Sequence, residues 1–384
     1  MSIVLVTDCE TRKALCVVRN LGASGHRVLC FGKNKFNMTK YSKYCQSFIL
    51  QKSINDNDLI NELNFIIKTE KVDVVIPMED DMVRILSDSS SKLLTKTLVP
   101  DINSFNMARD KEKTMKSALL NKVSIPNTYF LNNVNEIENT NIDFPVIIKP
   151  RIGAGSKGIK KCHNKKKLIE EYNHLVNNNQ HPIVQQFIEG DYKKIQVLLL
   201  FDKNSKINRS CVYEGIREYP VNGGPVTLWK TVFLPEIETK SIEWLKNENW
   251  VGFAEVEYLF NENTKEYYLM EINPRFSANI ALAHFVNINF ANQFVKLSLG
   301  TESSFKKNEI IDQYCQWLFP GDVLNYVFNK KRKEEKINYF FNKPYNLKDA
   351  IFSKHDPLPG LAQFVTIFSS KENFKSLKEK MKIK

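Results

Sequence analysis

Two acidic residues stand at equal distances from one turn in the stretch 250–276, WVGFAEVEYLFNENTKEYYLMEINPRF. Two runs of alternating apolar and polar residues flank a polar, Asn-rich tip, and this pattern predicts a β-hairpin. Glu257 and Glu271 each lie seven residues from Thr264, so a symmetric hairpin places their carboxylates opposite one another on adjacent strands. Because like charges in this arrangement destabilise a sheet, we expect a cation to compensate them.

Asn273 and Arg275 extend this set of polar side chains toward the end of the hairpin. Asn273 lies two residues beyond Glu271 and so faces the same side of the strand. Two carboxylates and an amide oxygen suit Mg²⁺, which commonly takes one or two protein carboxylates and shares phosphate oxygens of a substrate. Arg275 offers a planar set of donors for phosphate or carboxylate. The alternative, a surface hairpin with solvated acids, stays open on these residues alone.

A glycine-rich segment follows a predicted strand that ends at Lys149. Gly153, Gly155 and Gly158 spell G-x-G-x-x-G, but the strand-like residues 159–162 follow where a dinucleotide-binding fold needs a helix. The H-R-D and D-F-G strings of a protein kinase do not occur. We therefore interpret the segment as a loop whose backbone N–H groups close over phosphates, with Lys149 as a nearby point charge. An ordinary glycine-rich turn is the alternative.

Composition and charge limit the classes of protein. At 384 residues, with 42% hydrophobic and 26% charged residues, the chain fits a globular protein of two or three domains. The net charge of +12 is spread along the chain, and the basic clusters at 160–167 and 330–333 are interpreted as solvated faces. We expect an anionic small ligand rather than a nucleic acid.

Location is predicted from the cysteines and from the apolar runs. The seven cysteines form no C-x-x-C pair and are odd in number, which favours reduced thiols in a cytoplasmic protein. The first residues, MSIVLVTD, have neither the basic region nor the cleavage site of a signal peptide. No apolar run approaches the roughly 18 residues of a membrane span. We expect no membrane partner.

Residues 2–99 alternate between predicted strands and helices, which indicates a parallel sheet covered on both faces. The first strand-to-helix turn, TDCETRK, contains no glycine, so a dinucleotide fingerprint is missing there. Open sheets of this type usually bind ligands at the carboxyl ends of their strands. The predicted strands are 3–7, 27–31, 72–77 and 97–99, the helices are 11–24, 56–69 and 82–94, and the polar residues at the strand ends are Asp8, Thr11, Arg12, Glu79, Asp80 and Asp81.

The remaining chain mixes strands and helices without a repeat. Arg217 lies at the base of a loop with a Gly-Gly pair, which is either a mobile basic loop or a plain hairpin. Residues 301–384 form a smaller, less regular part. The predicted helices are 104–121, 166–177, 236–248 and 278–299, and the predicted strands outside the opening hairpin are 144–149, 182–187, 194–201, 207–219 and 226–233.

Taken in order, these elements resemble the ATP-grasp superfamily, specifically its carboxylate–amine ligases of the carbamoyl-phosphate-synthase-like type. The resemblance covers roughly residues 1–300 and depends on the order of five features. These are a lysine, a second lysine, the glycine-rich loop, the hinge Q-x-F-I-x-G and the hairpin ending E-I-N-P-R. The implied fold is α/β and α+β, with a pre-ATP-grasp parallel-sheet domain (1–103), an ATP-grasp domain (104–300) and a small C-terminal domain (301–384). The ATP-grasp domain would comprise a lid subdomain (about 125–187) and an antiparallel-sheet subdomain.

The resemblance also implies roles for single residues. Lys113 matches the first phosphate-binding lysine, and Lys111 is a close competitor because it follows Asp110. Lys149 matches the second lysine. The remaining implied contacts are Gly153, Gly155, Ser156 and Gly158 over the phosphates, Gln185, Gln186, Phe187 and Ile188 at the adenine, Asp191 at the ribose, Glu257, Glu271 and Asn273 on Mg²⁺, Arg275 at the transferred phosphate, and Arg217 at phosphate or the carboxylate substrate.

The implied activity is ATP-dependent ligation with Mg²⁺ or Mn²⁺. A carboxylate would be activated as an acyl phosphate and joined to an amine, and ADP and phosphate would be released. An amino acid, a peptide or a sugar acid would be compatible substrates, and a homodimer stays open. The sequence VNINFA at 286–291 departs from the family's usual pattern near the acceptor pocket, and one module without a glutaminase segment cannot be a complete carbamoyl-phosphate synthase. The alternatives are a non-catalytic ATP-binding module and a nucleotide-cofactor dehydrogenase.

Overall fold

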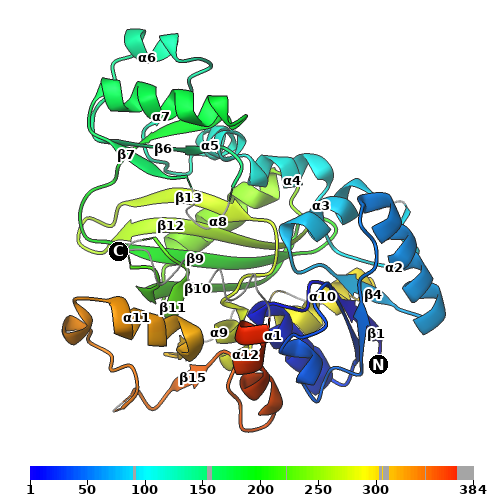
Figure 1. Cartoon of the computed structure of the whole chain (residues 1–384). Coiled ribbons are helices and arrows are strands. Elements are labelled where there is room, and N and C mark those ends of the chain that lie inside the picture. Colours follow the sequence, from blue (N-terminus) through cyan, green and yellow to red (C-terminus); the bar gives the residue numbers. More distant parts are fainter. Residues whose placement is uncertain are drawn as a thin grey trace.

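Three β-sheets organise the chain (Figure 1). The computed structural model describes residues 1–89, 92–153, 158–221, 223–301, 305, 311–341 and 343–369. A four-stranded parallel sheet comes first, a four-stranded antiparallel sheet stands above the centre of the view, and a seven-stranded sheet lies between them. Within the described ranges, every helix is too short or too polar to cross a lipid bilayer.

The N-terminal sheet has the predicted parallel pairing, in the order β3-β2-β1-β4. Strand β3 was missed because its four residues are mostly half-exposed and lack a clear alternation. The strand predicted at 97–99 is wrong, since these residues form no strand and only the preceding Lys96 makes a single bridge, to Val74. The elements are β1 (Ile3–Val6), α1 (Arg12–Ala23), β2 (Arg27–Gly32), η1 (Thr39–Tyr41), β3 (Ser47–Leu50), α2 (Asp56–Glu70), β4 (Val74–Ile76) and α3 (Asp80–Asp88).

Two short helices replace the single helix predicted at 104–121. Helix α4 (Ile102–Arg109) ends and α5 (Lys111–Leu120) begins at Asp110, whose backbone is extended at φ −95° and ψ 106°. The Asp110 carboxylate accepts hydrogen bonds from the backbone N–H groups of Glu112 and Lys113 and so caps α5. This break makes Lys111 the first residue of a new helix.

The small antiparallel sheet forms a lid subdomain with its own core. Its strands follow the order β5-β8-β6-β7, and apolar residues of α7 pack on one face of them. The glycine-rich loop joins β6 to β7, as predicted, and its residues 154–157 lie outside the described ranges. The elements are β5 (Thr128–Tyr129), α6 (Asn135–Asn139), β6 (Val146–Pro150), β7 (Lys160–Cys162), α7 (Lys165–Asn177) and β8 (Pro182–Gln186).

The seven-stranded sheet carries the predicted hairpin, formed by β12 and β13. Helix α8 covers one face of this sheet, and the other face shares a hydrophobic cluster with α1, α9 and α10. The elements are β9 (Tyr192–Phe201), β10 (Ile207–Glu218), β11 (Val226–Thr231), α8 (Pro235–Asn247), β12 (Gly252–Asn261), β13 (Tyr267–Asn273), α9 (Ile280–Phe285) and α10 (Phe290–Ser298).

The chain after α10 returns to the same sheet. Strand β14 pairs with β11, and β15 pairs with β14, so the order is β13-β12-β9-β10-β11-β14-β15. The single helix predicted at 278–299 is wrong, because Asn287 has a φ of +63° and separates α9 from α10. The elements of this last part are β14 (Tyr314–Gln316), η3 (Leu318–Asp322), α11 (Val323–Phe328), η4 (Arg332–Glu334), β15 (Leu347–Asp349) and α12 (Leu358–Ser369).

Candidate active site

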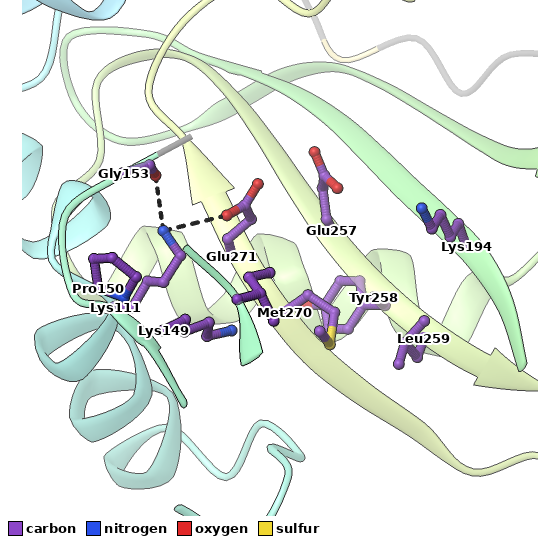
Figure 2. Close-up of a pocket in the computed structure, with 11 residues that line it drawn as sticks. Lys111, Lys149, Pro150, Gly153, Lys194, Glu257, Tyr258, Leu259, Met270 and Glu271 are labelled. Carbon is purple, nitrogen blue, oxygen red and sulfur yellow. Dashed lines mark hydrogen bonds and ion pairs between the residues drawn. The ribbon is translucent and has the colours of Figure 1, made fainter. Parts of the chain in front are cut away.

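The two acids of the hairpin face each other as the sequence predicted. Glu257 is paired with Glu271 in the register of β12 and β13, and both line one pocket. Figure 2 shows their carboxylates on the same side of the sheet. The side chain of Asn273 donates to Glu257 Oε1 over 2.9 Å, which confirms that it shares this face.

Glu255 is a third acid of this cluster, and sequence reasoning missed it. Its side chain is buried and accepts hydrogen bonds from Ser277 Oγ and from Asn273 Nδ2, the latter over 3.2 Å. The signal was present in the alternation Glu255-Val256-Glu257, which puts both glutamates on one face of β12.

Two lysines from different elements complete the pocket. Lys111 Nζ, at the start of α5, donates to the carbonyl of Gly153 over 2.8 Å and lies 3.5 Å from Glu271 Oε2 (Figure 2). Lys149, on β6, is 3% exposed. Burial lowers the pKa of Lys149 to about 8; the carboxylate of Glu271 raises it and the charge of Lys111 lowers it further. The pocket is lined by Lys111, Lys149, Pro150, Gly153, Ile159, Lys194, Glu257, Tyr258, Leu259, Met270 and Glu271.

Lys113 lies elsewhere. It lines a separate pocket with Asp110, Arg151 and residues of the 179–181 turn. Of the two lysines, Lys111 lies in the pocket with Glu257 and Glu271, whereas the sequence favours Lys113. The spacing to Pro126 does not distinguish two lysines two positions apart, and the helix break at Asp110, which places Lys111 at the start of α5, gives no sign in the sequence.

The acid cluster has an excess of negative charge on its own. Burial raises the pKa of Glu257 well above its usual value, and the charges of Glu255 and Glu271 raise it further. Among the described residues, no three His, Cys, Asp or Glu side chains are arranged to hold a metal ion by themselves. The carboxylates of Glu257 and Glu271 fit Mg²⁺ when oxygens of a bound substrate supply the remaining ligands. Asn273 would join them only after its amide turns, because its oxygen now accepts from Arg275 and its nitrogen faces Glu257.

Arg275 connects the hairpin to the N-terminal sheet. Its Nε lies 3.2 Å from Asp80 Oδ1 and 3.8 Å from Glu79 Oε2, and its Nη2 is 3.4 Å from Asn273 Oδ1. Lys13 Nζ, at the start of α1, is 3.0 Å from the same Glu79. The carboxyl ends of β1 and β4 thus meet the end of β13, as expected for ligand binding at this edge.

Arg217 does not reach this cluster. Its side chain is fully buried, forms an ion pair with Asp322, donates to the carbonyl of Ile337 and stacks on the ring of Tyr339 at 4.1 Å. The expectation that Arg217 meets phosphate or substrate is therefore corrected. It anchors β10 to the segment that follows β14.

Asp322→Asn is expected to lower the free energy of unfolding by about 3 kcal/mol, because it leaves the buried Arg217 charge without its partner. Urea denaturation measures the change. Asp56→Asn, which breaks the exposed pair with Arg84, is the matched control and should cost less than about 1 kcal/mol. Equal stability of the Asp322 variant and the wild type would contradict the anchoring role.

The predicted nucleotide hinge lies where β8 leaves the lid. Gln185 is buried and donates to Thr128 Oγ1 over 2.9 Å, so its side chain is held inside the lid sheet. The N–H of Phe187 is bonded to Pro145 O, and its ring lies under Lys161 Nζ at 3.6 Å. Gln186 and Asp191 are exposed and Ile188 is half-buried. Gly158 has a φ of +77°, and Gly155 and Ser156 lie outside the described residues.

Residues 110–304 match the family model described as the carbamoyl-phosphate synthase L chain, ATP binding domain. Acetyl-CoA carboxylase 1 of Arabidopsis thaliana is 28% identical over 167 residues, which are 41% of this chain and 7% of that protein. The acetyl-CoA carboxylase of Saccharomyces cerevisiae is 27% identical over 165 residues, again 7% of its length. The chain thus spans a small part of the curated relatives that it matches.

Solved structures share the fold over most of the chain. The biotin carboxylase domain of Hydrogenobacter thermophilus 2-oxoglutarate carboxylase, in complex with MgADP and bicarbonate, has a TM-score of 0.65 at 15% identity and covers 82% of this chain and 73% of that one. The N5-carboxyaminoimidazole synthetase of Staphylococcus aureus has a TM-score of 0.64 at 13% identity, with 82% and 81% covered. The L-amino acid ligase of Bacillus licheniformis has a TM-score of 0.63 at 13% identity, with 82% and 78% covered.

Proposed function

The chain belongs to the ATP-grasp family of the carbamoyl-phosphate synthase L chain, ATP-binding domain, and on this premise we propose that it is an ATP-dependent carboxylate–amine ligase. The observation that carries the proposal is the pocket in which Lys111 and Lys149 face Glu257 and Glu271. Cations on one side and acids on the other suit the phosphates of a nucleotide and its accompanying metal ion. We propose ATP and Mg²⁺, with Mn²⁺ as a substitute, as the cofactors.

The charged residues divide the work of phosphoryl transfer. Lys111 and Lys149 hold phosphate oxygens and offset the charge that develops on them. Glu257, Glu271 and Asn273 would hold Mg²⁺, which when bound neutralises phosphate charge and orients the oxygens that react. Arg275, whose Nε lies 3.2 Å from Asp80 Oδ1, would offer its guanidinium to the transferred phosphate at the end of β13.

The substrate carboxylate attacks the γ-phosphate, giving an acyl phosphate and ADP, and the amine then displaces phosphate. The lid contributes Lys149 and the β6–β7 loop, so its approach to the large sheet would exclude water that hydrolyses an acyl phosphate. The hinge residues Gln185, Gln186, Phe187 and Ile188, with Asp191, remain our proposal for the nucleoside, and Gly153, Gly155, Ser156 and Gly158 for the phosphates.

The substrates are small molecules in this proposal. Solved structures of similar fold include an L-amino acid ligase and a biotin carboxylase domain dimer bound to MgADP and bicarbonate, which supports a carboxylate substrate and is compatible with a homodimer. An amino acid, a peptide or a sugar acid would serve as the carboxylate, and an amine as the acceptor. We propose the cytoplasm, where ATP is available, as the location.

The test is an ADP-release screen of paired carboxylates and amines with Mg²⁺ and ATP, followed by mass spectrometry of the products. We expect release to require both substrates and the metal, and the product to carry a new amide bond. Omission of each component in turn is the control. Saturable ATP binding without ADP release for any pair would instead favour a non-catalytic ATP-binding module.

A further inference from the structure

Arg12, the first residue of α1, lies against two tryptophan rings. Its guanidinium carbon is 3.9 Å from the centre of the Trp317 ring and 5.3 Å from that of Trp229. Its Nε is 3.4 Å from the carbonyl oxygen of Ala278. The rings come from β11 and from the residue after β14, so three distant parts of the chain build this clamp.

The clamp holds a cation without a matching acid. In the part of the chain that the structure describes, no carboxylate lies within ion-pair distance of Arg12. Two acids whose charges act on Arg12 already have other partners. Asp349 accepts from the backbone N–H groups of residues 318, 351 and 352, and Glu255 accepts from Ser277 and Asn273. Burial lowers the pKa of Arg12 to about 10, although neighbouring acidic groups, among them Asp349 and Glu255, act to raise it.

The surrounding groups are also donors. The indole nitrogens of Trp229 and Trp317 are buried and have no hydrogen-bond partner among the described residues. The positive end of the α1 dipole disfavours a cation at this position, and Lys13 follows at once. The guanidinium of Arg12, the rings of both tryptophans and the N-terminus of α1 are thus close together, and neither the guanidinium nor the indole N–H groups have a carboxylate partner among the described residues.

This clamp is continuous with the proposed active site. Ala278, which contacts Arg12, follows Ser277, and Ser277 Oγ donates to Glu255. Glu255 and Glu257 are joined in turn by the amide of Asn273. Lys111 and Lys149 lie at the lid, where Lys111 is next to Glu271 (Figure 2). Arg12 reaches the acids instead through Ala278 and Ser277, so a ligand held by Arg12 would lie at the Glu255 end of the acid cluster.

We propose that Arg12, Trp229 and Trp317 bind a carboxylate of the amine substrate, which is therefore an amino acid or a related molecule that carries its own carboxylate. A planar guanidinium fork matches one carboxylate in geometry and charge. The indole rings add apolar walls for the adjoining carbon atoms. The role of this molecule as a substrate rests on the proposed ligase function. Binding of the carboxylate at Arg12 can be tested without any reaction.

The test compares amino acids with their amides on the MgADP-loaded protein. The probes are the twenty L-amino acids, the corresponding amino acid amides and inorganic phosphate, and the readout is tryptophan emission together with the unfolding temperature. We expect at least one amino acid to bind saturably and its amide to bind roughly 10-fold more weakly, because the charged hydrogen bonds to Arg12 are lost. Equal binding of acid and amide, or binding of phosphate alone, would overturn the carboxylate assignment. The absence of binding by every probe would overturn it as well.

Variants separate this site from folding and from ATP binding. Arg12→Met should weaken binding of the amino acid roughly 10-fold and leave binding of its amide unchanged. Arg12→Lys should bind the amino acid with an intermediate affinity. Arg84→Met, a change on the surface, should bind it like the wild type. Unchanged affinity for the amino acid in a folded Arg12→Met protein would overturn the inference. An amino acid whose binding depends on Arg12 but which never supports ADP release would refute the ligase function and keep the carboxylate site. ADP release by the Arg12→Met variant with an unchanged KM for the amine would refute the carboxylate site but keep the ligase function.

Discussion

Glu271→Gln is expected to reduce Mg²⁺-dependent ADP release by about 100-fold or more, with the fold unchanged. The substitution keeps the shape of the side chain but removes one of the two charges that face each other across β12 and β13. It weakens the metal site and removes the ion pair with Lys111 at the same time. Initial rates at saturating ATP, measured over a range of Mg²⁺ concentrations, give the effect.

Glu262→Gln is the matched control for this experiment. Glu262 lies at the exposed tip of the same hairpin and pairs with Lys193. A surface pair of this kind contributes less than about 1 kcal/mol, so its loss should leave ADP release near the wild-type rate. Near-normal activity of a folded, metal-saturated Glu271 variant would remove the metal assignment.

Lys111→Met and Lys113→Met are expected to differ sharply although the two positions are two residues apart. Lys111 lies at Glu271 and at the carbonyl of Gly153, where a phosphate would be held, so its loss should reduce ADP release by about 100-fold. Lys113 lines another pocket, so its loss should change the rate by about twofold or less, as surface substitutions usually do. Steady-state rates and the KM for ATP measure both.

Each lysine variant serves as the control for the other. The two changes remove the same charge from the first turn of α5, so any general effect on helix stability or net charge is shared. A large loss in Lys113→Met with little change in Lys111→Met would restore the preference that the sequence suggested.

Nearer the tip of the hairpin the strands pair Tyr258 with Leu269, one position out of the symmetric register, and an irregularity next to Glu257 brings it opposite Glu271. The shared face of these two glutamates could be predicted from the strand alternation. The choice between Lys111 and Lys113 could not, because it depends on where α5 begins. A single carboxylate, that of Asp110, sets this start, and periodicity across 104–121 gives no sign of the break. Glu255 was overlooked although it obeys the same alternation as Glu257.

The sequence misleads in opposite ways at two arginines: it suggests a site role for Arg217 and gives no sign of the surroundings of Arg12. Arg217 stands near glycines and resembles a loop arginine, but its partner Asp322 comes from a segment with no regular pattern. Arg12 was noted only as a polar residue at a strand end, since the rings that flank it belong to β11 and to Trp317, far along the chain. Contacts between such distant segments depend on tertiary packing, which local patterns do not encode.

The two short strands β14 and β15 have a practical consequence for anyone who wishes to produce part of this protein. A fragment trimmed to the family match, 110–304, would end before both strands and leave the backbone of β11 as a bare edge, open to pairing with other molecules. It would also lose Trp317 and the partner of Arg217. A fragment intended to stay in solution should therefore keep residues 314–349. Aggregation of a shorter fragment would be explained by the exposed edge of β11 and would not contradict the fold.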